Sequence, residues 1–216
     1  NRVYYSKNLE LHRSVVLRLT EQIRNCILVH QQPNARIARS GNLDPERVWR
    51  APLLDDSRVF RCAEEENQPS FTVDLLLDAS ASRLHCQEVI AAQGAILAES
   101  LSRCHIPVRV SSFCSLSGYT VVTRYRDYYE TDKNDRIFNY FTTGCNRDGL
   151  AIRALAKGLE DSPSEHKLVI LLSDVKPNDV IQMNHSGSFV EYAADNGIQN
   201  TAMEIRSLTY KGINVM

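Results

Sequence analysis

The stretch "VDLLLDASASRL", residues 73–84, decides how the rest of the chain is interpreted. It begins as a largely apolar run, which is typical of a strand buried on both faces of a sheet. The run ends at Asp78, and Ser80 and Ser82 follow at two-residue spacing. A buried strand that ends in a carboxylate and two hydroxyls is compatible with a catalytic loop, a metal-binding loop or a capped helix.

The overall composition limits the class of protein. The chain has 216 residues, enough for one main domain with a substantial core. Its net charge of −1 gives no general attraction to nucleic acid or to an anionic membrane, so neither is expected as a partner. No apolar run approaches the roughly 20 residues that span a bilayer, and the N-terminus lacks the apolar core of a signal peptide. We therefore expect a soluble, cytoplasmic protein without membrane insertion.

The cysteines and the ends of the chain add two further expectations. Six cysteines are scattered along the chain without a CxxC pair, which favours reduced thiols in the cytosol. The chain does not begin with Met, and its end, "KGINVM", resembles the opening of a strand. Both features are typical of a fragment of a longer protein.

The first third of the chain differs in pattern from the remainder. Residues 10–31 place apolar side chains at three- and four-residue spacing, which predicts an amphipathic helix of about six turns. Residues 32–70 are rich in Pro, Asn, Asp and Arg and predict short extended or single-turn pieces. We therefore expect residues 1–70 to form an N-terminal helix and packing arm, and residues 71–216 to form the main domain.

From residue 71 onward, short apolar strands alternate with amphipathic helices. Strands are predicted in "FTVDLLLD", "PVRVSSFC", "GYTVVTRY", "HKLVILLSD" and "GINVM"; helices are predicted over residues 83–103, in "DGLAIRALAKGLE" and over most of residues 187–210. This alternation favours a Rossmann-like α/β fold with a largely parallel central sheet and helices on both faces. The link of about four residues between the second and third strands is too short for a crossover, so an antiparallel edge strand is expected there.

Two of the predicted strands end in loops that carry acidic residues. Asp78, Ser80 and Ser82 follow the first strand, and Asp174 follows the strand in "VILLSDVKPND". Ligands of open α/β sheets bind at the carboxyl ends of the strands, so these side chains are expected to meet. Their hard oxygen atoms suit Mg²⁺, Mn²⁺ or Ca²⁺ better than zinc. The alternatives are helix capping by the first loop and a simple turn at Asp174.

Catalytic interpretations of the same residues are less favoured. A phosphoaspartyl phosphatase carries a second Asp two residues after the first, and the Ser80 found there cannot act as a general acid at neutral pH. No phosphate-binding glycine loop and no GxSxG elbow occurs in the sequence. A metal-assisted hydrolase that uses Asp78 and Asp174 stays open, although no base at a defined spacing accompanies them.

The DxSxS pattern of Asp78, Ser80 and Ser82, with the later "LLSD", resembles the metal-ion-dependent adhesion site of von Willebrand factor type A (vWA) domains. "NRDGLAIRAL" and "HKLVILLSDVKPND", with "SGNLDPERVWR" upstream, are similar to the bacterial nitric oxide reductase activation proteins and cobaltochelatase subunits. The resemblance covers about residues 40–216. It implies a vWA fold that binds one divalent cation, usually Mg²⁺: Asp78 through its carboxylate or a water, Ser80 and Ser82 directly, and Asp174 mainly through water.

The sequence departs from this family at two places. The third loop of the family normally supplies a Thr, and that position falls on Asn146 here, with Asp148 two residues later. Either residue is expected to contribute an oxygen; the alternative is that both cap the helix that begins near Gly149. Val175 stands where the family often has Gly, and because a β-branched residue disfavours positive φ, we expect the loop to avoid that conformation.

The resemblance implies a non-enzymatic, metal-dependent protein-interaction module. An Asp or Glu of a partner protein would complete the coordination of the cation. The branch further implies an AAA+ ATPase as the partner, with which the chain would activate, remodel or metallate a client enzyme. The competing hypotheses are the metal-assisted hydrolase and a vWA-like domain that binds its partners without metal.

Overall fold

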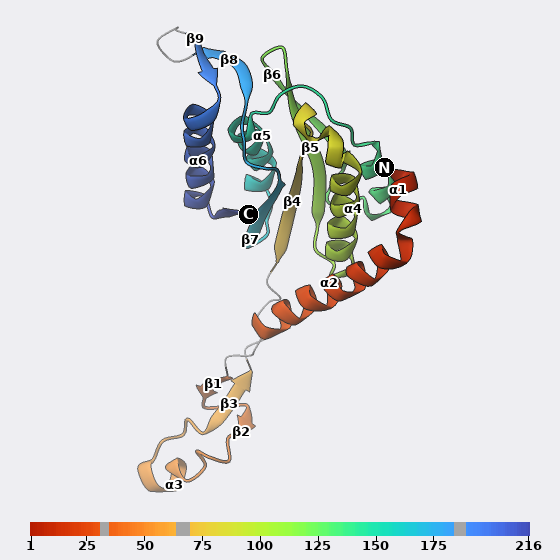
Figure 1. The fold of residues 1–216 in the computed structure, drawn as a ribbon. Helices are drawn as coiled ribbons and strands as arrows, with labels where there is room; N and C mark the ends of the chain where they lie inside the picture. The colour runs from red at the N-terminus through yellow and green to blue at the C-terminus, as the bar shows by residue number, and fades with distance from the viewer. Residues whose placement is uncertain (31–34, 64–69, 184–188) are drawn as a thin grey trace. The chain divides into compact units, whose positions relative to one another are not determined.

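The computed structural model describes residues 1–30, 35–63, 70–183 and 189–216 (Figure 1). The chain divides into two compact units, of which the first contains residues 1–23 and 70–216 and the second contains residues 24–69. The N-terminal residues therefore belong to the same unit as the main domain, and the segment between them forms a unit of its own. The predicted domain boundary at residue 70 stays a prediction.

The second unit contains a small antiparallel sheet. Its strands are β1 (Ala35–Ala38), β2 (Asn42–Leu43) and β3 (Phe60–Ala63), in the order β1-β3-β2. The short helix α3 (Arg50–Leu54) lies between β2 and β3 in the sequence. The short extended and single-turn pieces that were predicted here are present, and residues 32–34 and 64–69 of the predicted arm lie outside the described residues.

The first unit is built on a five-stranded sheet. Its order is β10 (Ile213–Val215), β7 (His166–Leu172), β4 (Phe71–Asp78), β5 (Val108–Leu116) and β6 (Tyr119–Arg126). The first four strands are parallel, and β6 pairs antiparallel with β5. Ser117 and Gly118 join β5 to β6 with φ values of 50° and 82°, as a two-residue type I′ hairpin requires. The predicted largely parallel sheet with one antiparallel edge strand is therefore confirmed.

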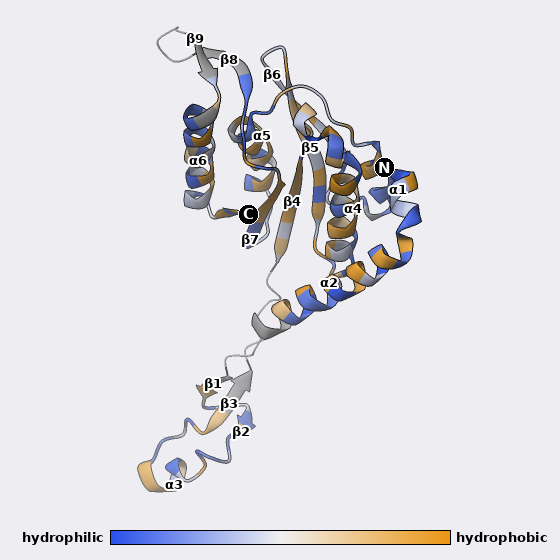
Figure 2. Ribbon diagram, in the orientation of Figure 1, coloured by the Kyte–Doolittle hydropathy of each residue, from blue (hydrophilic) through white to orange (hydrophobic). Residues whose placement is uncertain are grey.

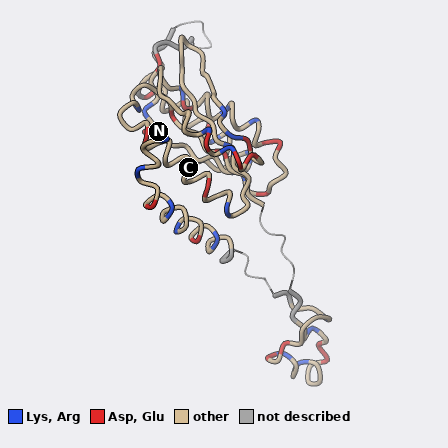
Figure 3. Tube along the Cα trace, turned by 90° about the vertical axis from the view of Figure 1, so that its right-hand side faces the viewer, with Lys and Arg blue, Asp and Glu red and all other residues tan. Residues whose placement is uncertain are grey.

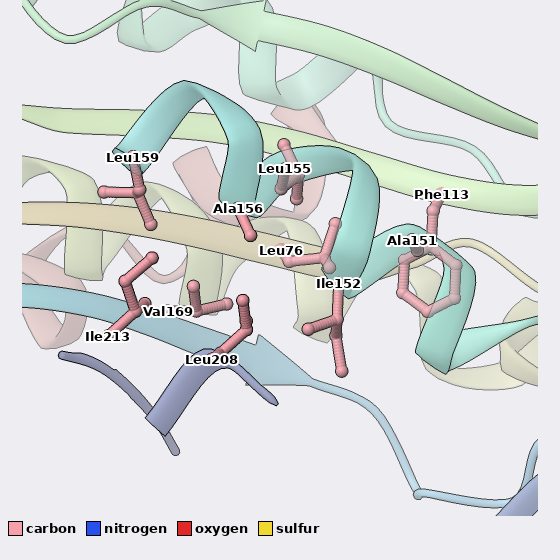
Figure 4. Close-up of a cluster of buried hydrophobic side chains, with 10 residues drawn as sticks. All are labelled: Leu76, Phe113, Ala151, Ile152, Leu155, Ala156, Leu159, Val169, Leu208 and Ile213. Atoms are coloured by element: carbon pink, nitrogen blue, oxygen red, sulfur yellow. The ribbon is translucent and has the colours of Figure 1, made fainter. Parts of the chain in front are cut away.

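The central strand β4 is buried on both faces, which explains its mostly apolar sequence. Its alternate side chains point to opposite layers of the unit. A Cβ built on Gly94 in α4 (Gln87–Arg103) would lie 3.3 Å from Leu77 Cδ1, so Leu77 packs closely on that helix. Leu76 faces the opposite layer, in a cluster with Phe113, Ala151, Ile152, Leu155, Ala156, Leu159, Val169, Leu208 and Ile213 (Figure 4). Figure 2 shows the hydrophobic β4 between these layers.

Helices cover both faces of the sheet, as predicted. The layer around α4 contains α1 (Arg2–Lys7) and the 3-10 segments η1 (Ala81–Cys86) and η2 (Thr131–Asn139). The layer on the other face contains α5 (Asp148–Glu160) and α6 (Ala194–Tyr210), which pack on each other and on β10 (Figure 1). Both acidic and basic residues occur along α2 (Leu9–His30) (Figure 3). Among the described residues, no helix is long and apolar enough to cross a membrane.

Two predicted helices begin later than expected. The helix predicted over residues 83–103 starts as the 3-10 segment η1 and becomes α-helical only at Gln87. The helix predicted over most of residues 187–210 begins at Ala194, because β8 (Asp179–Met183) and β9 (Phe189–Tyr192) form an antiparallel pair before it. The β-branched and aromatic side chains of "FVEY" favour a strand. Residues 187 and 188 lie outside the described residues.

A buried ion pair joins β4 to β5 within the sheet. Asp74 and Arg109 are register partners, and Arg109 Nε and Nη2 donate to the two carboxylate oxygens of Asp74 at 2.8 and 2.5 Å. Arg109 Nη2 also donates to the carbonyl of Leu155 at 3.0 Å, and the guanidinium lies 4.8 Å from the ring centroid of Tyr128. This fork arrangement satisfies a carboxylate that the apolar strand would otherwise bury alone.

Candidate metal centre

The predicted site residues lie at the carboxyl edge of the parallel sheet. Asp78 is the last residue of β4 and is fully buried, and Asp174 follows shortly after the end of the neighbouring strand β7. A cleft of about 520 Å³ opens at this edge, and its walls include Ser80, Ser82 and Asn146 together with Asp174. The topology thus brings three separate loops to one place, as expected for an open α/β sheet.

The first loop turns its polar atoms together. Asp78 Oδ1 accepts the backbone N–H of Ser80 at 2.9 Å, which folds the loop into an Asx-type turn. The Oγ atoms of Ser80 and Ser82 lie 3.0 Å apart, within hydrogen-bond distance. Asp78 Oδ2 accepts the hydroxyl of Ser173 at 3.1 Å, and this bond links the first loop to the loop after β7.

The first loop is also joined to the segment before α5. The hydroxyl of Tyr140 donates to the carbonyl of Asp78 at 2.5 Å. The N–H of Thr143 donates to the carbonyl of Ala79 at 2.7 Å, and the N–H of Ala81 donates to the carbonyl of Gly144 at 2.9 Å. Residues 140–144 therefore run alongside the Asp78 loop and fix its backbone from one side.

The loop that leads into α5 places Asn146 two residues before this helix and Asp148 at its first position. Asn146 Oδ1 accepts the backbone N–H of Asn178 at 2.9 Å, and its amide nitrogen donates to Asp148 Oδ1 at 3.3 Å. These bonds engage the Asn146 amide with a neighbouring loop and not with the N–H groups of α5. Asp148 is fully buried, and its Oδ2 atom has no hydrogen-bond partner among the described residues. An orphaned buried carboxylate oxygen is costly, so Asp148 is the stronger third-loop candidate for a cation ligand.

The electrostatics of Asp148 place the three acidic residues in one neighbourhood. The pKa of Asp148 is raised to about 7, first by burial and then by the negative charges of Asp78 and Asp174, while the hydrogen bond from Asn146 opposes the shift. The charges of Asp78 and Asp174 disfavour the ionised form of Asp148, and a bound divalent cation would offset this repulsion.

Arg83 supplies a positive charge inside the same cluster. Its Nη2 atom donates to Asp174 Oδ2 at 2.5 Å, and its Nε donates to Ser82 Oγ at 3.3 Å. The side chains of Arg83 and Asp174 are only 18% and 23% exposed, so this ion pair is partly shielded from water. Asp174 Oδ1 in addition accepts the backbone N–H of Lys176 at 3.4 Å.

The expectation that the loop after β7 avoids positive φ is wrong. Val175 has φ of 55°, in the left-handed region that β-branched residues disfavour. The N–H of Val175 donates to Ser173 Oγ at 3.1 Å, and this bond helps to support the strained backbone. The loop therefore keeps the conformation that Gly would allow, at a cost in conformational energy.

Replacing Val175 by Gly is expected to stabilise the protein by about 0.5–1 kcal/mol, because Gly adopts this φ without a Cβ penalty while losing more backbone entropy on folding. Urea denaturation of both proteins measures the difference. Val121 in β6 is also partly exposed but has no positive φ, so Val121→Gly should destabilise the protein. Equal destabilisation by both changes would contradict the assignment of strain to Val175.

Sequence reasoning missed three residues that shape this site: Arg83, Ser173 and Tyr140. Arg83 directly follows the DxSxS pattern and Ser173 directly precedes Asp174, so their proximity to the site could have been inferred from position alone. Tyr140 lies 62 residues from Asp78, and no spacing in the sequence indicates that they meet.

The donor set is compatible with a hard divalent cation. In the parts of the chain that the structure describes, no three His, Cys, Asp or Glu side chains are arranged to bind an ion by themselves. A cation here would therefore also require the Ser80 and Ser82 hydroxyls, which is the oxygen-rich environment that Mg²⁺ prefers. The orphaned Oδ2 of Asp148 fits the same requirement.

Comparison with known proteins supports the fold. No family model matches the sequence, and no curated protein matches it. The PilB minor pilin of Streptococcus sanguinis matches with a TM-score of 0.54 at 15% identity, over 72% of this chain and 51% of the pilin chain. The pilus adhesin SpaC of Lactobacillus rhamnosus GG, in its open conformation, matches with a TM-score of 0.52 at 15% identity, over 69% of this chain and 24% of the adhesin.

A vWF domain, that of the type V pili tip protein Mfa5 of Porphyromonas gingivalis, also matches, with a TM-score of 0.45 at 12% identity, over 54% of this chain and 41% of that one. Together with the sheet order, the similarities to PilB and SpaC support a mixed α/β fold with a mostly parallel sheet. At such low identity they concern the fold alone. This chain spans about a quarter of the SpaC structure and half of the PilB structure.

Proposed function

We propose that the chain is a non-enzymatic interaction module that binds a divalent cation, Mg²⁺ in the first instance, through Asp78, Ser80, Ser82 and Asp148, with Asp174 acting mainly through water. The cation would present an open coordination position at the cleft, and an Asp or Glu of a partner protein would occupy it. The buried, unpaired Oδ2 of Asp148 is the observation that carries this proposal, because a cation is the ligand that best satisfies such an atom.

The surface around the cleft supports a protein as the partner. Large apolar side chains are exposed in the segments that carry the site residues: Leu84 in η1 is 69% exposed, Phe141 is 62% exposed and Val175 is 52% exposed. Apolar side chains around a polar centre are typical of a surface that binds another protein.

The class of the partner rests on sequence resemblance. The stretches "NRDGLAIRAL" and "HKLVILLSDVKPND" favour an AAA+ ATPase partner, with a cytoplasmic location and a role in activating, remodelling or metallating a client enzyme. The solved structures described above are pilus proteins and concern the fold alone, so the ATPase partner and the location stay predictions.

Isothermal titration of Mg²⁺ tests the cation site. We expect heat of binding with the wild-type protein and none with Asp78→Ala, because Asp78 is buried at the centre of the three loops. Asp161→Ala, which removes an exposed acid after α5, is the matched control and should bind as the wild type does. Absence of binding by the wild-type protein to Mg²⁺, Mn²⁺ and Ca²⁺ would contradict the proposal.

Two further measurements separate the competing functions. A pull-down of the ATPase that chelator abolishes would support the metal-bridged interaction, whereas one that chelator does not affect would favour a metal-independent module. Hydrolysis of generic phosphoesters that Asp78→Ala abolishes would favour the hydrolase.

A further inference from the structure

Arg83 contacts two of the oxygen atoms that the proposed cation would use, that of Ser82 directly and that of Asp174 mainly through water. Its guanidinium donates to Asp174 Oδ2 and to Ser82 Oγ, at 2.5 and 3.3 Å. A guanidinium only donates hydrogen bonds, so each of these contacts uses a lone pair of an oxygen that would otherwise face a metal ion. The Arg83 guanidinium therefore supplies the positive charge that a bound metal ion would otherwise supply to these oxygens.

The charge of the cluster points in the same direction. The negative charges of Asp78 and Asp174 both act on the carboxyl group of Asp148, and Arg83 pairs with Asp174. The pair is mostly shielded from solvent, so its attraction is stronger than that of a typical surface pair. Lys176 borders the same cleft but is exposed, and its backbone N–H is the group that contacts Asp174.

We propose that Arg83 is the affinity-determining residue of the site: its guanidinium and a divalent cation compete for Asp174 and Ser82, and the cation binds only as Arg83 leaves them. This inference rests on the proposed function. It predicts that the site is tuned to weak, reversible cation binding, because each binding event must break an ion pair that the folded chain already contains.

The test is Mg²⁺ titration of wild type, Arg83→Gln and Lys176→Gln by calorimetry. Arg83→Gln removes the charge and the fork and should bind Mg²⁺ about tenfold more tightly than wild type. Lys176→Gln removes an equal charge from the same cleft and should change the affinity by less than about twofold. Thermal unfolding gives a second readout: added Mg²⁺ should raise the Tm of Arg83→Gln more than that of wild type.

The outcomes separate the two proposals. Tighter binding by Arg83→Gln than by the wild type, with the affinity of Lys176→Gln little changed, would support the competition. Equal affinity in wild type and Arg83→Gln would overturn the competition and leave the cation site intact. Equal tightening by Arg83→Gln and Lys176→Gln would also overturn it, since the effect would then be general electrostatics. Absence of binding by all three folded proteins would overturn both. If Arg83→Gln does not fold, Arg83→Met serves in its place, with the same expected result.

Discussion

Replacing Asp74 by Ala is expected to lower the free energy of unfolding by about 3–5 kcal/mol, because it leaves Arg109 charged and buried without its partner. Asp74 in β4 and Arg109 in β5 lie where the sheet faces α5, and their side chains are only 1% and 7% exposed. A Cβ on Gly158 of α5 would lie 2.5 Å from Arg109 Nη1, so the helix leaves little room for the guanidinium to rearrange. Denaturation in urea, followed by circular dichroism, measures the change.

A double variant distinguishes the loss of the attraction between Asp74 and Arg109 from the cost of leaving the Arg109 charge buried without a partner. Asp74→Leu combined with Arg109→Met removes both charges and should recover most of the stability, since buried ion pairs are often replaceable by apolar residues of similar size. The exposed pair of Arg124 and Asp127 provides the control, and Asp127→Ala should cost less than about 1 kcal/mol. A loss below 1 kcal/mol in Asp74→Ala would show that Arg109 finds another partner or reaches water.

In the presence of chelator, the folded protein is expected to lose stability as the pH rises from about 4 to about 7. The pKa of Asp148 is raised to about 7 in the folded state by burial and by the charges of Asp78 and Asp174. Between these pH values the folded protein binds a proton on Asp148 that the unfolded chain has already released, so deprotonation opposes folding. A shift of about 3 pH units corresponds to at most about 4 kcal/mol.

The contribution of Asp148 is isolated by comparison with Asp148→Asn. The neutral amide cannot ionise, so the variant should be more stable than the wild type at pH 7.5, and the two should differ little at pH 4. Asp161→Asn, at the exposed end of α5, should follow the wild-type profile. Parallel profiles for wild type and Asp148→Asn between pH 4 and 7.5 would contradict the assignment.

The sheet could be predicted from the sequence because its signals are local. The apolar run before Asp78 predicts a buried strand, and the short link between β5 and β6 predicts an antiparallel hairpin; each signal lies within a few residues. The hairpin of β8 and β9 was missed because its strands are only five and four residues long, and such short segments carry little periodicity. The three-stranded sheet of residues 35–63 likewise pairs strands too short to be recognised individually as a sheet.

The candidate site was predictable in its strand-end residues and not in its long-range contacts. Asp78 and Asp174 could be placed together because parallel strands end at the same edge of a sheet. The pairing of Arg83 with Asp174, 91 residues apart, depends on the path of each loop after its strand. The φ of Val175 was predicted incorrectly. The preference of a β-branched residue for negative φ is outweighed here by the conformation of the surrounding loop, which cannot be deduced from the residue type alone.

The bonds that join residues 140–144 to the Asp78 loop have a consequence for ligand affinity. Tyr140, Thr143 and Gly144 each form a hydrogen bond with this loop, so the two segments lose their conformational freedom together when the chain folds. A ligand that binds there meets a preorganised surface and bears little further entropy loss from loop ordering. Differences in affinity among ions at this edge should therefore reflect how readily each ion sheds its own water.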